Sequence, residues 1–197
     1  LNNGRPEQMG LKQVISSFVS FREEVIYKRT RFHLKKARER AHILAGLMVA
    51  LTSIDEVITL IRSAPDTETA KNSLTSRAWP VSEIEEFIKL IDDPEHVVKE
   101  GKYYLSEIQA KAILELRLQR LTGMEREKLS QETEEIANKI TEYLEILSSR
   151  EVLLNILKSE LLSTKEKMDG ERRTFISDHA IDADDEDLIQ QEEMVVT

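Results

Sequence analysis

The strongest chemical feature of the sequence is a cluster of cations between Lys28 and Arg40. This stretch holds seven basic side chains and a single acid, Glu39. Such a density of positive charge attracts nucleic-acid phosphates, and it equally suits a solvated helix face that pairs with an acidic neighbour. Both roles, ion pairing and contact with double-stranded DNA, stay open for the same residues: Lys28, Arg29, Arg31, Lys35, Lys36, Arg38 and Arg40.

No residue pattern in the sequence predicts a catalytic centre or a metal site. The chain has no cysteine, which excludes a cysteine nucleophile and a thiolate zinc site. It has neither a phosphate-binding G-x-x-x-x-G-K-[ST] loop nor a G-x-S-x-G nucleophile turn. The histidines lack metal-ligand spacing, and we interpret His33 and its neighbour Phe32 as packing residues. The four histidines are His33, His42, His96 and His179.

The composition predicts an all-α protein. Ala, Glu, Lys, Leu and Arg make up 90 of the 197 residues, which is typical of long helices. The net charge of −9 divides into +5 over residues 1–62, −3 over 63–123 and −11 over 124–197. The absence of cysteine fits a cytoplasmic chain. No apolar run approaches the length of a membrane span, so no membrane partner is expected.

Two long helices are predicted, one in each half of the chain. Residues 11–62 contain no proline and a single glycine, Gly46, and their apolar residues recur in steps of three and four. Residues 125–168 contain neither proline nor glycine, and an apolar residue stands at every seventh position: Ile140, Leu147, Leu154, Leu161 and Met168. The segment between them begins and ends on these helices, so the sequence predicts an antiparallel coiled-coil hairpin.

The segment between the long helices is predicted to be a small globular knob of short helices. Three capping signals start these helices, and the last helix spans residues 107–121 with Gly123 as its C-cap. The signals are Asp66, the pair Ser82 and Glu85, and the pair Ser106 and Gln109. We therefore predict four parts: a first arm (1–62), a tip (63–123), a returning arm (124–169) and an acidic connector (170–197).

The connector is predicted to be short irregular structure that ends in the start of a strand. Its acidic run, residues 182–187, has Asp187 where a calcium-binding loop needs glycine, so we interpret it as a linker or a helix start. The chain begins at Leu1 and stops after an apolar Met-Val-Val sequence, which predicts a piece of a larger protein with a further domain after Thr197.

The 107–121 helix is the candidate for self-association. It is apolar on more than one side, and a short helix of this kind must be covered on more than one side. A second copy of the chain is one source of that cover, and packing within one chain is the other. The predicted homodimer contacts are Leu105, Ile108, Gln109, Ala112, Ile113 and Leu116.

Several motifs resemble the A subunit of bacterial DNA gyrase, and they run through the whole chain. They are residues 4–6 (GRP), 9–12 (MGLK), 21–25 (FREEV), 36–44 (KARERAHIL), 105–114 (LSEIQAKAIL), 121–123 (LTG) and 172–174 (RRT). The related topoisomerase IV protein is less similar around residues 36–44.

The resemblance implies a type IIA topoisomerase, which passes one DNA duplex through a transient break in another. It implies coiled-coil arms whose tips meet as an exit gate, and a B subunit that supplies the ATP and Mg²⁺ sites. The DNA-cleaving tyrosine of that family lies upstream of this region, and none of the tyrosines here matches its motif, so no catalytic residue is carried over. These tyrosines are Tyr27, Tyr103, Tyr104 and Tyr143.

Two other classes of protein use a long helical hairpin. One is the tether of a chromosome-organising ATPase, or a plain dimerising coiled coil. The other is a binding arm such as the tRNA-reaching hairpin of a synthetase. The residues alone leave these alternatives open.

Overall fold

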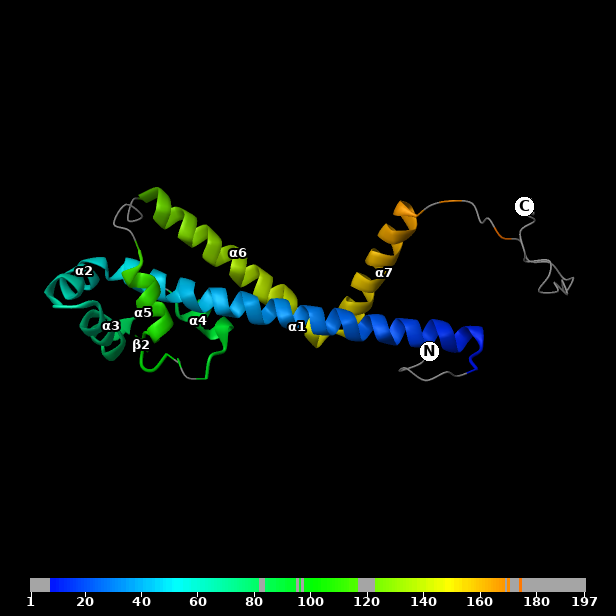
Figure 1. The fold of residues 1–197 in the computed structure, drawn as a ribbon, viewed down its shortest axis with the longest axis horizontal. Helices are drawn as coiled ribbons and strands as arrows, with labels where there is room; N and C mark the ends of the chain where they lie inside the picture. The colour runs from blue at the N-terminus through cyan, green and yellow to red at the C-terminus, as the bar shows by residue number, and fades with distance from the viewer. Residues whose placement is uncertain are drawn as a thin grey trace, which may run out of the picture. The chain divides into compact units, whose positions relative to one another are not determined.

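The computed structural model describes residues 8–81, 84–94, 96, 98–116, 123–168, 170 and 174, with the backbone alone for 123–125. The chain forms two compact units, residues 1–160 and 161–197. Helices dominate the described residues, and the all-α prediction is confirmed. Figure 1 shows the elements of the chain.

The first long helix is shorter than the sequence predicts. Helix α1 spans Leu11–Thr52, and α2 spans Ile54–Ser63 at 92° to it, so the predicted single helix over 11–62 is wrong at Ser53. Neither proline nor glycine marks this bend. Beyond the bend, Val57 of α2 is buried in the core. No single described helix is long and apolar enough to cross a membrane, and α1 and α2 meet that test only jointly, across the bend.

Five short elements follow α2 and include a small antiparallel sheet. The sheet pairs Trp79 with Tyr103, both buried, and the Trp79 indole N–H donates to the Leu74 carbonyl at 3.0 Å. The sequence did not predict these strands, which are three residues each. The elements are α3 (Thr67–Ser76), β1 (Ala78–Pro80), α4 (Glu85–Ile91), β2 (Lys102–Tyr104) and α5 (Glu107–Leu114).

The capping predictions have mixed outcomes. Asp66 caps α3 by accepting from the Thr69 amide at 2.7 Å, as predicted. Ile84 is the N-cap of α4 in place of the predicted pair Ser82 and Glu85, and Ser82 itself lies outside the described residues. The apolar face predicted for α4 is buried, from Ile84 to Ile91.

Helix α5 ends earlier than predicted. It stops at Leu114, where the chain enters a turn with the Leu116 amide donating to the Ile113 carbonyl at 3.1 Å. The helix therefore does not continue past Leu114 toward residue 121 as predicted. Residues 117–122 lie outside the described part. Gly123 opens the next helix and does not cap α5.

The returning arm is two helices, α6 (Gly123–Ser148) and α7 (Arg150–Lys167), separated at Ser149. The predicted unbroken helix is therefore wrong at Ser149. Ile146 before the break and Leu153 and Leu157 after it form a cluster with Ile26 of α1. The predicted positions Leu147 and Leu154 are only half-buried.

Helix α6 runs against the direction of α1, at an angle to it (Figure 1). Along α6, as residue numbers on α1 fall, those of the partners rise: Arg40 pairs with Glu132, and His33 stacks on Tyr143. This order does not continue along α7, where Arg150 pairs with Glu23 and Glu160 pairs with both Arg22 and Arg29. The main core joins residues 34–50 of α1 and Val57 of α2 to α3, α4, α5, the sheet and Ile140 of α6.

The second unit is described over 161–168, 170 and 174. Its helical part is the end of α7, which stops at Lys167, three residues before the predicted stop at Gly170. The acidic run and the predicted strand lie outside the described residues.

Candidate functional site

The start of α5 is held by the capping box that the sequence predicts. The Ser106 hydroxyl accepts from the Gln109 amide at 3.2 Å, and the Ser106 amide donates to Gln109 Oε1 at 2.9 Å. Each side chain satisfies a backbone N–H that the first turn of a helix leaves without a partner. The box therefore fixes the residue at which α5 begins.

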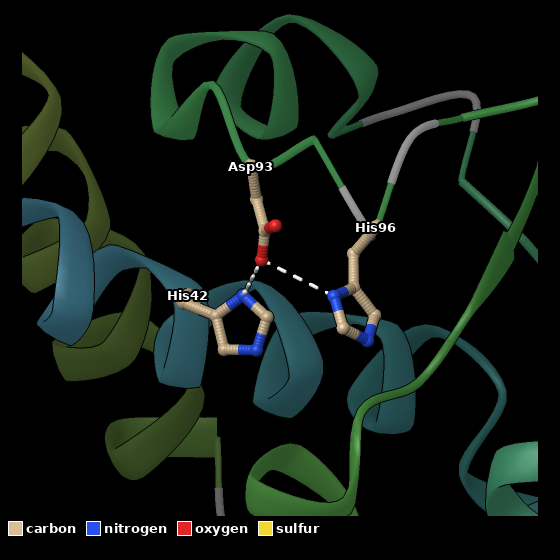
Figure 2. Close-up of side chains that lie close together, drawn as sticks. All are labelled: His42, Asp93 and His96. Carbon is tan, nitrogen blue, oxygen red and sulfur yellow. Dashed lines mark hydrogen bonds and ion pairs between the residues drawn. The ribbon is translucent and has the colours of Figure 1, made fainter.

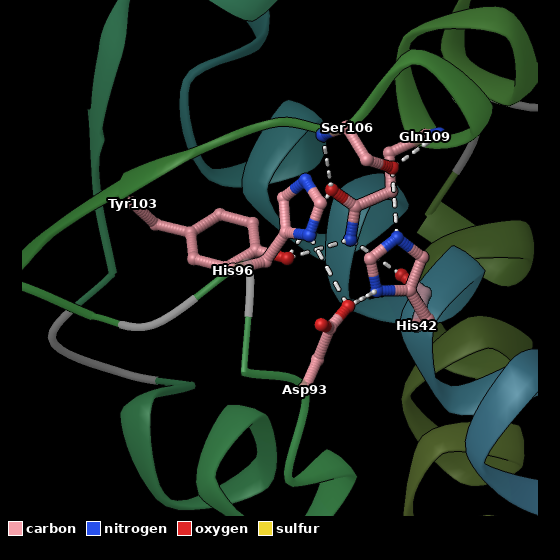
Figure 3. Close-up of polar contacts among 6 residues, drawn as sticks. All are labelled: His42, Asp93, His96, Tyr103, Ser106 and Gln109. Atoms are coloured by element: carbon pink, nitrogen blue, oxygen red, sulfur yellow. Dashed lines mark hydrogen bonds and ion pairs between the residues drawn. The ribbon is translucent and has the colours of Figure 1, made fainter.

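Gln109 also attaches α5 to α1 (Figure 3). Its side chain is fully buried, and Nε2 donates to the His42 carbonyl at 2.6 Å and to the Tyr103 hydroxyl at 2.9 Å. A buried amide without partners costs about 1–3 kcal/mol, and here both ends of the amide are bonded. Burial raises the pKa of Tyr103, with a smaller opposing effect of its bond to Gln109, so the phenol stays protonated.

Gly46 makes this contact between α1 and α5 sterically feasible. In a regular helix the amide of residue 46 bonds to the carbonyl of residue 42, and a side chain at 46 would lean back toward that carbonyl. A Cβ at Gly46 would lie 2.6 Å from Gln109 Cβ and 2.7 Å from Cγ. Glycine is therefore required for Gln109 to reach the His42 carbonyl.

The fold gathers two histidines that are far apart in the sequence. His42 of α1 and His96, in the segment after α4, both face Asp93, whose Oδ2 lies 3.4 Å from His42 Nδ1 and 3.2 Å from His96 Nδ1. Nε2 of His42 lies 2.7 Å from the Ser106 hydroxyl oxygen. Spacing in the sequence gave no signal for this group because 50 residues lie between His42 and Asp93.

Burial lowers the pKa of His42, the nearby His96 lowers it further, and Asp93 opposes both effects. His42 is therefore held toward its neutral form.

The packing role predicted for His33 and Phe32 is only partly observed. His33 stacks on Tyr143 with ring centroids 6.0 Å apart, whereas Phe32 is 58% exposed.

The six predicted dimer contacts do not share one surface. Leu105, Gln109 and Ile113 are buried in the core of this chain. Ile108 is 63% exposed, and Ala112 and Leu116 are half-buried. The outward face of α5 therefore consists of Ile108 and Ala112, flanked by the exposed Lys111 and Glu115.

Most of the predicted DNA-contacting cations form ion pairs within the chain. Arg40 donates to both carboxylate oxygens of Glu132, at 2.7 and 2.9 Å, and Arg29 reaches Glu160. Within the described part of the chain, Arg31 has no ion-pair partner. The other pairs are Lys28 with Glu24, Lys35 and Lys36 with Glu39, and Arg38 with Asp92.

Comparison with known proteins identifies the family. Residues 1–162 match the family of the DNA gyrase/topoisomerase IV A subunit. The chain belongs to this family. The matched range contains the whole first unit, with the capping box, the Gln109 contact and the basic run. It favours the topoisomerase resemblance over the tether and the tRNA-binding arm.

Individual relatives agree with this assignment. The chain is 52% identical over 197 residues to the DNA gyrase A subunit of Rickettsia bellii. The matched region covers all of this chain and 22% of the relative. It is 45% identical over 206 residues to the DNA gyrase A subunit of Salmonella typhimurium, covering all of this chain and 24% of the relative. The chain spans about a fifth of the length of the curated relatives it matches.

Replacing Gly46 with alanine is expected to destabilise this family member. The new methyl group would overlap Gln109, and overpacking of this kind costs about 1–3 kcal/mol, against a gain of about 1 kcal/mol from removing a helical glycine. A carbon–carbon approach of 2.6 Å places the overpacking cost in the upper part of that range, so we expect a net loss of about 1–2 kcal/mol in urea unfolding. The matched control Ser16→Ala, on an exposed part of α1, should change stability by less than about 0.5 kcal/mol. A Gly46→Ala chain as stable as the parent would contradict the steric argument.

Stability is expected to fall below about pH 6.5 because of His42. Its folded-state pKa lies below the unfolded value of 6.5, so below that pH the unfolded chain takes up a proton that the folded chain resists. The stabilisation is complete above the unfolded pKa and is lost as the pH falls. Urea midpoints between pH 7.5 and 5.5 should therefore drop, and His42→Gln should flatten the drop. His33→Gln serves as the control, because it removes a histidine elsewhere on α1.

Proposed function

We propose that this chain forms part of the arm and the dimerising tip of an ATP-dependent type IIA DNA topoisomerase. In this proposal the tips of two copies meet as the exit gate for a transported duplex. The B subunit supplies the ATPase with its Mg²⁺, and the complex works on double-stranded DNA in the cytoplasm. The match to the gyrase and topoisomerase IV family over residues 1–162 carries the proposal.

The outward face of α5 supports the dimerising role. The inner half of this helix is occupied by Gln109, Ala110 and Ile113, which are buried in the chain's own core. Ile108 remains exposed on a rigidly anchored helix, and covering it by a partner removes apolar surface from water. An interface of this kind can form without changing the fold of either copy.

A gate must open as well as close, which limits the size of the interface. A small, reversible contact suits this requirement better than an obligate, core-like interface. The charged neighbours Lys111 and Glu115 flank the apolar residues and belong to the polar rim that such contacts have.

The basic run supports contact between the arm and DNA through a subset of its cations. Lys28 and Lys35 are 72% and 77% exposed, and their partners are acids on the same helix. Exposed pairs of this type are weak, so a phosphate can replace the carboxylate. Together with Arg31, they are the residues we propose to face a duplex.

Charge on the outer face of α5 is expected to separate the dimer. Ile108→Glu places a carboxylate in the proposed contact, where its desolvation is unfavourable. Sedimentation velocity at micromolar concentration should show a dimer for the parent chain and a folded monomer for the variant. Phe32→Glu is the matched control, because Phe32 is an exposed apolar residue on α1 (58% against 63% for Ile108). A parent monomer, or a dimer that survives Ile108→Glu, would contradict this placement.

Neutralising the three proposed DNA contacts is expected to weaken binding and its salt dependence. Each phosphate contact contributes about 0.9 to the slope of log K against log salt. In anisotropy titrations of a short duplex, the variant Lys28→Gln/Arg31→Gln/Lys35→Gln should therefore show a slope smaller in magnitude by about 2–3. The control Arg29→Gln/Arg38→Gln/Arg40→Gln removes the same number of positive charges, but from arginines that pair with acids outside α1. Equal effects of the two variants would indicate a general charge effect and no specific contact.

A further inference from the structure

The group of His42, Asp93 and His96 has a composition and geometry that the proposed gate function does not use. Figure 2 shows the three side chains converging from α1 and from the segment after α4. One ligand atom from each lies within 4.8 Å of the other two. The side chains are 13%, 28% and 23% exposed, so the group is partly buried and accessible to small ions. It borders a cavity of about 800 Å³.

The distances in the group suit an ion between the side chains. Zinc binds imidazole nitrogen and carboxylate oxygen at about 2.0–2.2 Å, which places two ligands of a tetrahedral site about 3.3–3.4 Å apart. Asp93 Oδ2 lies 3.4 Å from Nδ1 of His42 and 3.2 Å from Nδ1 of His96. The His96–Asp93 contact also meets the geometry of a hydrogen bond, but it is longer than the about 2.7–2.9 Å of charge-assisted hydrogen bonds between such groups. The two distances to Asp93 are thus close to those of ligands sharing a metal, and all three ligand atoms lie within 4.8 Å of one another.

The second nitrogen of His42 completes the pattern. Metal-binding histidines commonly donate their other ring N–H to an oxygen, which orients the ring and fixes its tautomer. Nε2 of His42 lies 2.7 Å from the Ser106 hydroxyl oxygen. A proton on Nε2 leaves the lone pair of Nδ1 directed toward Asp93. Ser106 is itself fixed as the N-cap of α5.

We propose that His42, Asp93 and His96 bind a transition-metal dication, with Zn²⁺ as the best fit and water as the fourth ligand. Two imidazoles and one carboxylate suit Zn²⁺, Co²⁺ or Ni²⁺, whereas Mg²⁺ and Ca²⁺ prefer oxygen ligands. The ion would join α1 to the segment after α4 and, through Ser106, to the start of α5.

The charges around the site set the expected strength of binding. Arg31, Lys35 and Arg38 line the same cavity and oppose a dication, while Glu39 and the ligand Asp93 favour it. Neutral imidazole is the binding form, so protons compete with the metal as the pH falls. With three protein ligands and this mixed field, we expect micromolar affinity for Zn²⁺ at pH 7.5.

The test is titration of the full 197-residue chain with ZnCl₂ at pH 7.5, monitored by calorimetry. We expect one equivalent to bind, and Asp93→Asn and His96→Ala to weaken binding at least about tenfold. Both substitutions lie outside the helices, so the fold should survive, which circular dichroism checks. The control His33→Gln/His179→Gln removes the two histidines that take no part in the proposed site and should leave the affinity unchanged. Cobalt should give the intense visible absorption of a tetrahedral site in the parent chain and in the control, and this absorption should be lost in Asp93→Asn and His96→Ala.

A second measurement separates a built site from incidental binding of zinc. At ten times its dissociation constant, Zn²⁺ should slow amide exchange over residues 106–114 about tenfold in the parent chain, because a ligand of the folded state protects what it holds. Asp93→Asn should remove this protection. Failure to bind one equivalent, equal binding by Asp93→Asn and the parent, or equal competition by Mg²⁺ would each overturn the proposal.

Discussion

One hydrogen bond, from the Gln109 side chain to the His42 carbonyl, attaches α5 to α1. The amide is fully buried, so each of its polar groups must find a partner inside the chain. The required approach is closer than any side chain at Gly46 would permit. Because Gln109 also closes the capping box with Ser106, the same residue fixes both where α5 lies and where it begins.

This anchoring separates the parts of α5 that fold the chain from the part that faces outward. Gln109 and Ile113 point into the core, and Ile108 points away from it. In the proposed gate, association therefore uses surface that folding leaves unused. The same division explains how a gate can open repeatedly: losing a partner exposes Ile108 and leaves the buried amide and its bonds intact.

The sequence predicted what depends on local signals and missed what depends on distant contacts. The Asp66 cap, the Ser106–Gln109 box and the buried face of α4 were correct because each is encoded within four to eight residues. The bends at Ser53 and Ser149 carry no proline or glycine, so no local signal in the sequence marks them. The apolar pattern of α5 could not distinguish a partner from the chain's own core, so Leu105, Gln109 and Ile113 were assigned to an interface. The histidine cluster was missed because the fold alone brings its members together.

His42 is the residue through which these arrangements meet. Its carbonyl accepts from Gln109, its Nε2 lies beside Ser106 and its Nδ1 faces Asp93. A proton or an ion at Nδ1 therefore acts on a residue that already carries both attachments of α5. A ligand can shift the equilibrium between α5 attached to α1 and α5 detached from it only by as much as its affinities for these two arrangements differ. Asp93 and His96 come from the segment after α4, whereas His42 comes from α1. A ligand bound to all three therefore favours the arrangement in which this segment lies against α1. The attachment of α5 to α1 keeps Ser106 beside His42 in that arrangement.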